Sequence, residues 1–197
     1  MQAQFTPREV AELSGTPKRT VEKAIEEKVF TTKMVKRGRR QRRMLPAHAV
    51  AYALIVRRVK YRMDAAMKRR LATALSRLDN AELRTWRFEL EHAVEMDVGR
   101  LVGDSMERAE AYGFARDKLI VEDDDILGGT PVIRGTRISV YSILGRLTHG
   151  DTVADILSDY PDLTAEAVEA AAIFARSHPL VGRPGGRPWL AAACENR

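Results

Sequence analysis

The sequence is poor in cysteine and in long apolar runs. Its one cysteine, Cys194, has no partner within the chain, which excludes an intramolecular disulfide framework and a cysteine-rich zinc site. No stretch reaches the roughly eighteen consecutive apolar residues of a membrane-spanning helix. Residues 1–5 also lack the apolar core of a signal peptide. We therefore expect a cytoplasmic protein.

The chain also lacks the patterns that identify common enzyme sites. It contains no P-loop, no dinucleotide-binding fingerprint and no nucleophile elbow. The adjacent acids of residues 122–125 cannot all converge on one cation, so we interpret them as a solvated turn. The histidines lack the spacing of metal ligands: His48, His92, His149 and His178. We expect no enzymatic activity, no cofactor and no metal ion.

Charge is distributed very unevenly along the chain. Residues 1–70 hold 19 Lys and Arg against 6 Asp and Glu, a net charge of +13. Residues 71–197 hold 14 Lys and Arg against 21 Asp and Glu, a net charge of −7. Such an asymmetry indicates that one half meets a polyanion and the other half meets something else. Nucleic acid is the first candidate for the basic half.

The first thirty residues predict two short helices joined by a tight turn. Thr6 is a candidate N-cap, with Pro7 at the first helical position and Glu9 completing a capping box. Gly15 suits the turn, and Thr16 is expected to cap the second helix. A recognition helix presents its N-terminal residues to the bases, so we predict DNA contacts from that part of the second helix: Lys18, Arg19, Thr20 and Lys23.

A basic β-hairpin is expected next. Residues 31–35 are β-prone, residues 36–43 form a cationic loop with one glycine, and apolar Met44 and Leu45 follow. Crowded cations of this kind suit phosphates or the minor groove. The predicted contacts are Lys36, Arg37, Arg39, Arg40, Arg42 and Arg43. The order of helix, turn, helix and basic hairpin resembles the MerR-like winged helix-turn-helix over roughly residues 5–60. The alternative is a small helical scaffold with a solvated charged face.

The C-terminal part carries the most specific motif of the chain. Paired glycines precede Thr130-Pro131, the segment continues through Arg134-Gly135-Thr136-Arg137, and Ser139 and Thr164 are expected to cap helices. With the Asp-Tyr-Pro-x-Leu-Thr sequence at residues 159–164, this stretch resembles domain-of-unknown-function family 433. The resemblance implies an antitoxin of the VapB-like class, which pairs with a PIN-like ribonuclease toxin.

The charge of this module distinguishes between two kinds of partner. Three short helices can also form a second DNA-binding site, but residues 117–178 hold 5 Lys and Arg against 11 Asp and Glu. Because an acidic surface opposes phosphate, we assign the module to protein contacts. A Pro- and Gly-rich tail follows, and its Arg183, Arg187 and Trp189 could bind the toxin. The alternative is a disordered tail without a role.

Together these patterns predict a mainly α protein with small β elements. The middle segment is expected to be helical with a short β element, because Trp86, Phe88 and Leu90 alternate with polar residues. We expect a winged helix-turn-helix at residues 1–60, a helical linker or dimerisation region at 61–116, a C-terminal three-helix module preceded by short strands at 117–178, and a flexible tail at 179–197.

The function expected from this organisation is that of a type II antitoxin. It would neutralise a PIN-like ribonuclease toxin by direct binding and repress its own operon by binding operator DNA as a homodimer. One alternative is a stand-alone MerR-like transcriptional regulator without a toxin partner. Another is an adaptor protein whose basic half binds nucleic acid without sequence preference.

Overall fold

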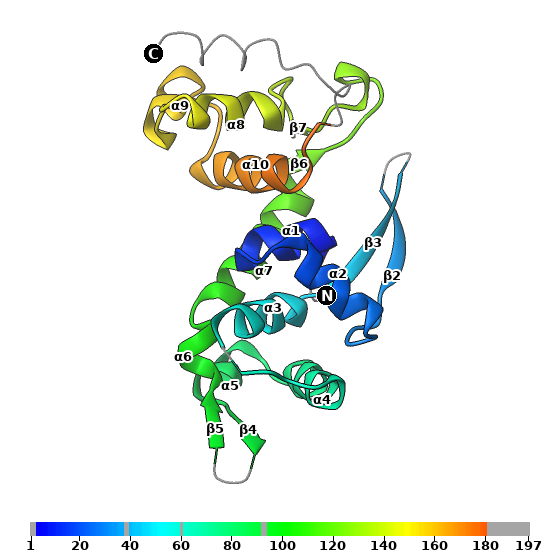
Figure 1. The fold of residues 1–197 in the computed structure, drawn as a ribbon. Coiled ribbons are helices and arrows are strands. Elements are labelled where there is room, and N and C mark those ends of the chain that lie inside the picture. Colours follow the sequence, from blue (N-terminus) through cyan, green and yellow to red (C-terminus); the bar gives the residue numbers. More distant parts are fainter. Residues whose placement is uncertain (1–2, 38–39, 60, 92–93, 181–197) are drawn as a thin grey trace, which may run out of the picture.

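The computed structural model describes residues 3–37, 40–59, 61–91 and 94–180, and its elements form three successive groups along an elongated molecule (Figure 1). The fold is mainly α with small β elements, as the sequence predicts. None of the helices in these ranges combines the length and the apolar composition needed to cross a lipid bilayer. The N-terminal group comprises β1 (Gln4–Phe5), α1 (Pro7–Ser14), α2 (Lys18–Glu26), β2 (Lys33–Arg37), β3 (Arg40–Pro46) and α3 (His48–Arg58).

The predicted wing is present, although its strands are longer than the sequence suggested. β3 lies at the centre of a three-stranded antiparallel sheet, between β1 and β2. The β2–β3 register pairs Lys33 with Met44 and continues to Arg37 opposite Arg40. The expectation that residues 36–43 form one basic loop is therefore wrong, because the ladder continues through the charged run. Long cationic side chains fit the two faces of an exposed hairpin without interrupting its backbone hydrogen bonds.

The middle group contains α4 to α7 and a second hairpin. The alternation around Trp86 correctly predicts a two-stranded element, and its buried side chains include Phe88, Leu90 and Met96. A capping box formed by Asp79 and Glu82 begins a new helix after α4. The elements are α4 (Ala65–Leu75), α5 (Asn80–Thr85), β4 (Arg87–Glu91), β5 (Val94–Asp97), α6 (Val98–Val102) and α7 (Ser105–Leu119).

The C-terminal group is the predicted three-helix module. Ser139 and Thr164 each accept a hydrogen bond from the backbone N–H three residues on, so both predicted helix caps are confirmed. A short antiparallel pair, β6 with β7, precedes the helices. The elements are β6 (Ile120–Val121), a 3₁₀ turn (Leu127–Gly129), β7 (Val132–Ile133), α8 (Val140–Thr148), α9 (Val153–Asp159) and α10 (Ala165–Ser177).

Two hydrophobic cores hold these groups together. The first extends from Phe5 and Val10 through α3 and the second hairpin to Ala115, and it also includes Ala170 of α10. The second lies among α8, α9 and α10, with Ile143 and Phe174 as members. Helix α10 packs against α1 and α7 as well as against α8. The domain boundaries expected from the sequence stay a prediction.

Candidate nucleic-acid interface

The N-terminal helices α1 and α2 are joined by a tight turn, and local sequence signals fix the start and the end of α1. Thr6 and Glu9 form the predicted capping box at the start of α1. Gly15 ends the helix with φ +61°, a left-handed conformation that side chains rarely adopt. A Cβ at this position would also collide with the Arg57 guanidinium, which donates a hydrogen bond to the Ser14 carbonyl at 3.0 Å. The positive φ is the reason that this turn favours glycine, whereas the arginine side chain could move aside at the cost of its hydrogen bond to Ser14.

The start of α2 differs from the expectation. Thr16 does not cap this helix, because α2 begins at Lys18 with Pro17 in the capping position and has no side-chain cap. The Thr16 hydroxyl instead donates a hydrogen bond of 3.2 Å to the Ala53 carbonyl, and the side chain is buried. The prediction failed because a capping hydroxyl and a hydroxyl that binds a neighbouring helix have the same local sequence. The bond fixes the turn to α3.

The exposed face of α2 carries most of the predicted contact residues. Val21 and Ala24 are buried, and at 3.6 residues per turn Arg19 lies roughly opposite them. Lys18, Arg19 and Lys23 are exposed, whereas Thr20 is only partly exposed. The same surface holds acids, since Lys18 and Glu22 form an ion pair of 2.6 Å. Arg19 is thus the central cation of the helix.

The wing separates its cations between two faces. Paired residues of an antiparallel ladder share a face, so Arg43 lies with Met34 and Arg42 lies with Val35. Lys36 and Arg43 are exposed, and Met34 beside them is 59% exposed. Arg42, in contrast, is only 14% exposed and forms an ion pair of 2.8 Å with Glu122. Arg39 lies outside the described residues, and of Arg37 and Arg40 only the backbone is described.

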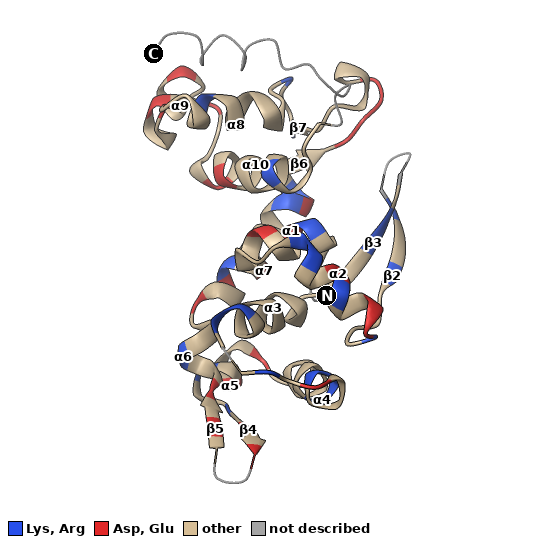
Figure 2. Cartoon of the chain, in the orientation of Figure 1, with Lys and Arg blue, Asp and Glu red and all other residues tan. Residues whose placement is uncertain are grey.

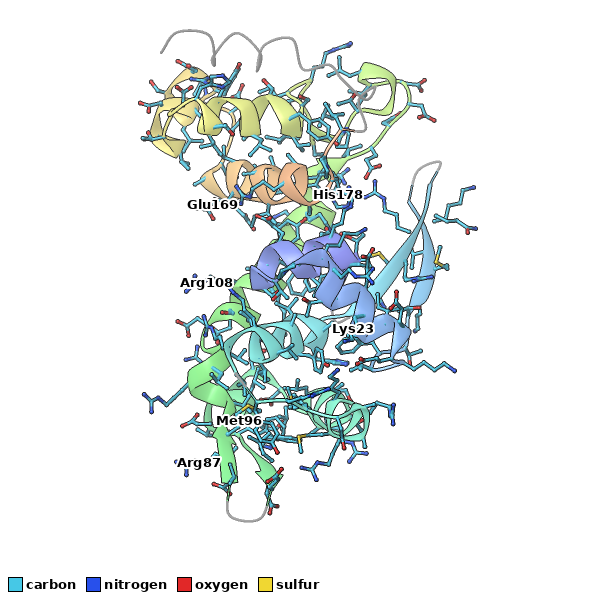
Figure 3. The ribbon with its side chains drawn as sticks, in the orientation of Figure 1. Lys23, Arg87, Met96, Arg108, Glu169 and His178 are labelled. Atoms are coloured by element: carbon cyan, nitrogen blue, oxygen red, sulfur yellow. The ribbon has the colours of Figure 1, made fainter. Side chains whose placement is uncertain are left out.

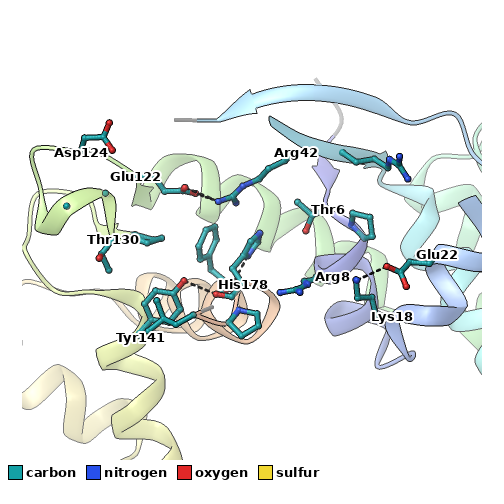
Figure 4. A pocket seen from close by; sticks show the side chains of 18 of the residues that line it. Thr6, Arg8, Lys18, Glu22, Arg42, Glu122, Asp124, Thr130, Tyr141 and His178 are labelled. Atoms are coloured by element: carbon teal, nitrogen blue, oxygen red, sulfur yellow. Dashed lines mark hydrogen bonds and ion pairs between the residues drawn. The ribbon is translucent and has the colours of Figure 1, made fainter. Parts of the chain in front are cut away.

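A cavity of about 740 Å³ lies between the wing, the starts of α1 and α2, and the C-terminal module (Figure 4). One wall consists of Thr6, Arg8, Lys18 and Glu22, and the facing wall includes Glu122, Asp124, Thr130 and Tyr141. Figure 2 shows the acidic stretch in the loop that leads to β7, on the same side of the molecule as the wing. The predicted solvated turn at residues 122–125 thus borders the candidate DNA-binding surface.

His178 lies at the base of this cavity. Its ring stacks on Phe174 with centroids 4.2 Å apart, and its buried Nε2 atom has no hydrogen-bond partner among the residues that the structure describes. Burial lowers the pKa of His178, and the nearby Glu9 carboxylate offsets only part of this effect. The histidine is therefore neutral at pH 7. It adds no positive charge to the cavity.

A buried ionic network joins α1 to α7, and nothing in the sequence singled it out. Glu9 accepts hydrogen bonds of 2.8 Å from both Arg116 and Tyr112 while it also receives the Thr6 backbone N–H. The side chains of Glu9 and Arg116 are 1% and 2% exposed. Burial raises the pKa of Glu9, but the surrounding charges and hydrogen-bond donors, first among them the Arg116 guanidinium, together hold it below its usual value. The network fixes the helix-turn-helix to the rest of the protein.

The predicted toxin-binding residues of the tail, Arg183, Arg187 and Trp189, lie outside the described residues. The predicted DNA contacts whose side chains the structure describes fall into three groups. Lys18, Arg19, Lys23, Lys36 and Arg43 are exposed cations, Thr20 is partly exposed, and Arg42 is engaged by the C-terminal module. The sequence missed Arg8, which lines the cavity beside Lys18. Its position in the first turn of the first predicted helix could have identified it as a candidate.

Comparison with known proteins gives a limited set of matches. No solved structure matches the chain. The chain is 38% identical over 88 residues to "Uncharacterized protein y4eO" of Sinorhizobium fredii. That match covers 45% of this chain and 39% of the relative, so the chain spans well under half of the relative's length. Residues 120–175 match the family model described as "Protein of unknown function (DUF433)", which confirms the family that the glycine-rich motif predicted for this part of the chain.

Proposed function

We propose that this protein binds duplex DNA through α2 and the β2–β3 wing and represses transcription of its own operon. The observation that carries the proposal is the helix-turn-helix itself. Its turn is fixed by Gly15, its second helix exposes Arg19 and Lys23, and the adjoining hairpin exposes Lys36 and Arg43. Such an arrangement lets a helix read base edges in the major groove while the hairpin contacts phosphate.

DNA binding is tested with the full-length protein and a duplex from its own promoter. The Arg19→Ala variant should lose preference for promoter over shuffled DNA, because Arg19 is the central cation of the exposed face of α2. Arg108→Ala is the matched control, since Arg108 is an exposed arginine on the opposite side of the molecule from Lys23 (Figure 3). Equal affinity of the parent for promoter and shuffled DNA would favour the nonspecific adaptor instead.

The wing is expected to contribute through charge alone. Replacing Lys36 and Arg43 with Ala should weaken binding to all sequences equally and flatten the dependence of log Kd on log salt by about two units, since each phosphate contact contributes about 0.9. Fluorescence anisotropy between low and physiological salt measures this slope. If the slope of the double variant equals that of the parent, the wing does not contact DNA.

We further propose that the C-terminal module binds a protein toxin of the PIN-like ribonuclease class. Its net negative charge and its resemblance to VapB-like antitoxins support this role, and a homodimer would place two modules on one operator. Co-expression with the adjacent gene of the operon tests the proposal. Co-purification and loss of the partner's ribonuclease activity are expected. If the protein binds DNA but neither co-purifies with the partner nor inhibits its ribonuclease activity, the alternative of a stand-alone MerR-like regulator is favoured.

A further inference from the structure

The C-terminal module contacts the wing through Arg42. The Arg42 Nη2 atom lies 2.8 and 2.9 Å from the two carboxylate oxygens of Glu122. The two side chains are 14% and 22% exposed, so salt screens the pair less than it screens a surface pair. The Arg42 guanidinium also lies 5.8 Å from the centre of the Phe174 ring. A charged contact and an aromatic contact thus hold the wing against this module.

The direction of Arg42 follows from the strand register. Side chains alternate along β3, so Arg42 shares a face with buried Met44, whereas Arg43 points to the other face. Arg42 is therefore directed across the cavity at the acidic loop. Asp124 lines the same cavity beside Glu122. The carboxylates of the acidic loop therefore face the same basic surface that, in the proposed function, binds DNA phosphates.

The size of the cavity determines whether DNA can bind while Arg42 contacts Glu122. A volume of about 740 Å³ is that of a pocket for a small molecule and is too small to admit a DNA duplex. Lys18, at the start of α2, lines the cavity together with Arg42. A duplex that contacts both residues at once has no room between the two walls. DNA and the acidic loop therefore compete for one surface.

We propose that Glu122 acts as an intramolecular substitute for a DNA phosphate, holding Arg42 in a closed arrangement that must open before the wing and α2 bind DNA together. This inference rests on the proposed function in DNA binding. A carboxylate and a phosphate offer an arginine equivalent oxygen acceptors, so the exchange replaces one charged hydrogen-bonded pair with another. The closed contact lowers DNA affinity by the free energy needed to break it.

The test compares the Glu122→Gln variant with Glu169→Gln in the full chain. Glutamine keeps the size of the side chain and removes its charge. Glu169 is an exposed glutamate of the same module that lies toward the opposite end of α10 from His178 (Figure 3). Glu122→Gln should bind promoter DNA about three- to tenfold more tightly than the parent, the range expected for loss of one partly buried ion pair. Glu169→Gln should change the Kd by less than about twofold.

A second comparison separates the contact from general charge repulsion. In an Arg42→Ala background the Glu122→Gln change should no longer tighten binding, because no cation remains for Glu122 to hold. A gain that persists in this background, or a Glu122→Gln variant that binds no more tightly than Glu169→Gln, overturns the inference while DNA binding itself stands. If neither the parent nor any variant binds DNA, the proposed function fails and the inference fails with it.

Discussion

Removing the charge of Glu9 should destabilise the protein more than any change at the exposed basic face. In the Glu9→Gln variant, Arg116 keeps its charge at 2% exposure and loses the carboxylate to which it donates a hydrogen bond of 2.8 Å. Breaking a buried ion pair by removing one partner costs about 3–5 kcal/mol when the remaining charge is left without a counter-ion. Arg116 keeps one counter-ion, because its Nε atom lies 2.9 Å from the half-exposed Asp117 carboxylate, so we expect a loss at the lower end of this range. The Thr6 N–H and the Tyr112 hydroxyl bind different carboxylate oxygens, so the single amide oxygen of glutamine cannot accept from both, and one of these donors faces the amide NH2 group instead.

The loss of stability in Glu9→Gln should also depend on pH, and the pKa of Glu9 predicts the direction of this dependence. Because the groups around Glu9 hold its pKa below the ordinary value of 4.5, the pair contributes stability above that pH, and the contribution is lost as the pH falls through the folded-state pKa. The difference in unfolding free energy between parent and Glu9→Gln should therefore be largest near pH 7 and shrink as the pH falls below 4.5. The double variant Glu9→Gln, Arg116→Met should recover part of the loss, since it leaves no buried charge.

Urea unfolding followed by circular dichroism at 222 nm measures these differences at each pH. At neutral pH, a loss of 3 kcal/mol corresponds to a decrease of about 6–12 °C in Tm for a chain of this size. The reasoning is refuted if Glu9→Gln costs less than about 1 kcal/mol at pH 7, or if its cost stays constant as the pH falls. Either result would mean that Arg116 finds an equivalent partner or that water reaches the site.

Three further substitutions have effects that the structure specifies. Gly15→Ala should cost about 1–2 kcal/mol and lower the Tm, because the residue has φ +61° and the new Cβ meets Arg57; an unchanged Tm would contradict this. Ser139→Ala should cost about 1 kcal/mol through loss of the α8 cap, with exposed Ser142→Ala as the control for hydroxyl removal. Gly113→Ala should destabilise by about 1–3 kcal/mol despite the better helix propensity of alanine, because its Cβ would lie 3.2 Å from the Phe5 ring; a stabilised variant would show that α7 can shift.

Features that depend on neighbouring residues were predictable from the sequence. Helix caps and tight turns need only a few consecutive residues to form, so a short sequence pattern is enough to predict their geometry. This applies to the capping box at Thr6, the glycine turn and the caps at Ser139 and Thr164. The alternation at Trp86 likewise predicts the second hairpin, since a half-buried strand repeats every two residues. The exposed cations of α2 follow from the same local argument.

Features that depend on distant residues were not predictable. Glu9 has the local sequence of an exposed capping glutamate, and its burial follows from Arg116, which is 107 residues away. Arg42 has the composition of a DNA contact, and its pairing with Glu122 spans 80 residues. Thr16 differs from a capping threonine only in the presence of α3 beside it. In each case the sequence identifies the chemical group correctly and cannot identify its partner.

Helix α10 has a consequence for how the protein unfolds. Its Ala170 belongs to the core that includes Phe5 and Val10, and its Phe174 belongs to the core of the C-terminal module. Unfolding of either core removes packing contacts from the other, because both include side chains of α10. Calorimetry should therefore record one cooperative transition instead of two separate peaks. A protease that cut within α10 would loosen both ends of the molecule at once, and a protein bound along this helix would protect the distant N-terminal helices from hydrogen exchange.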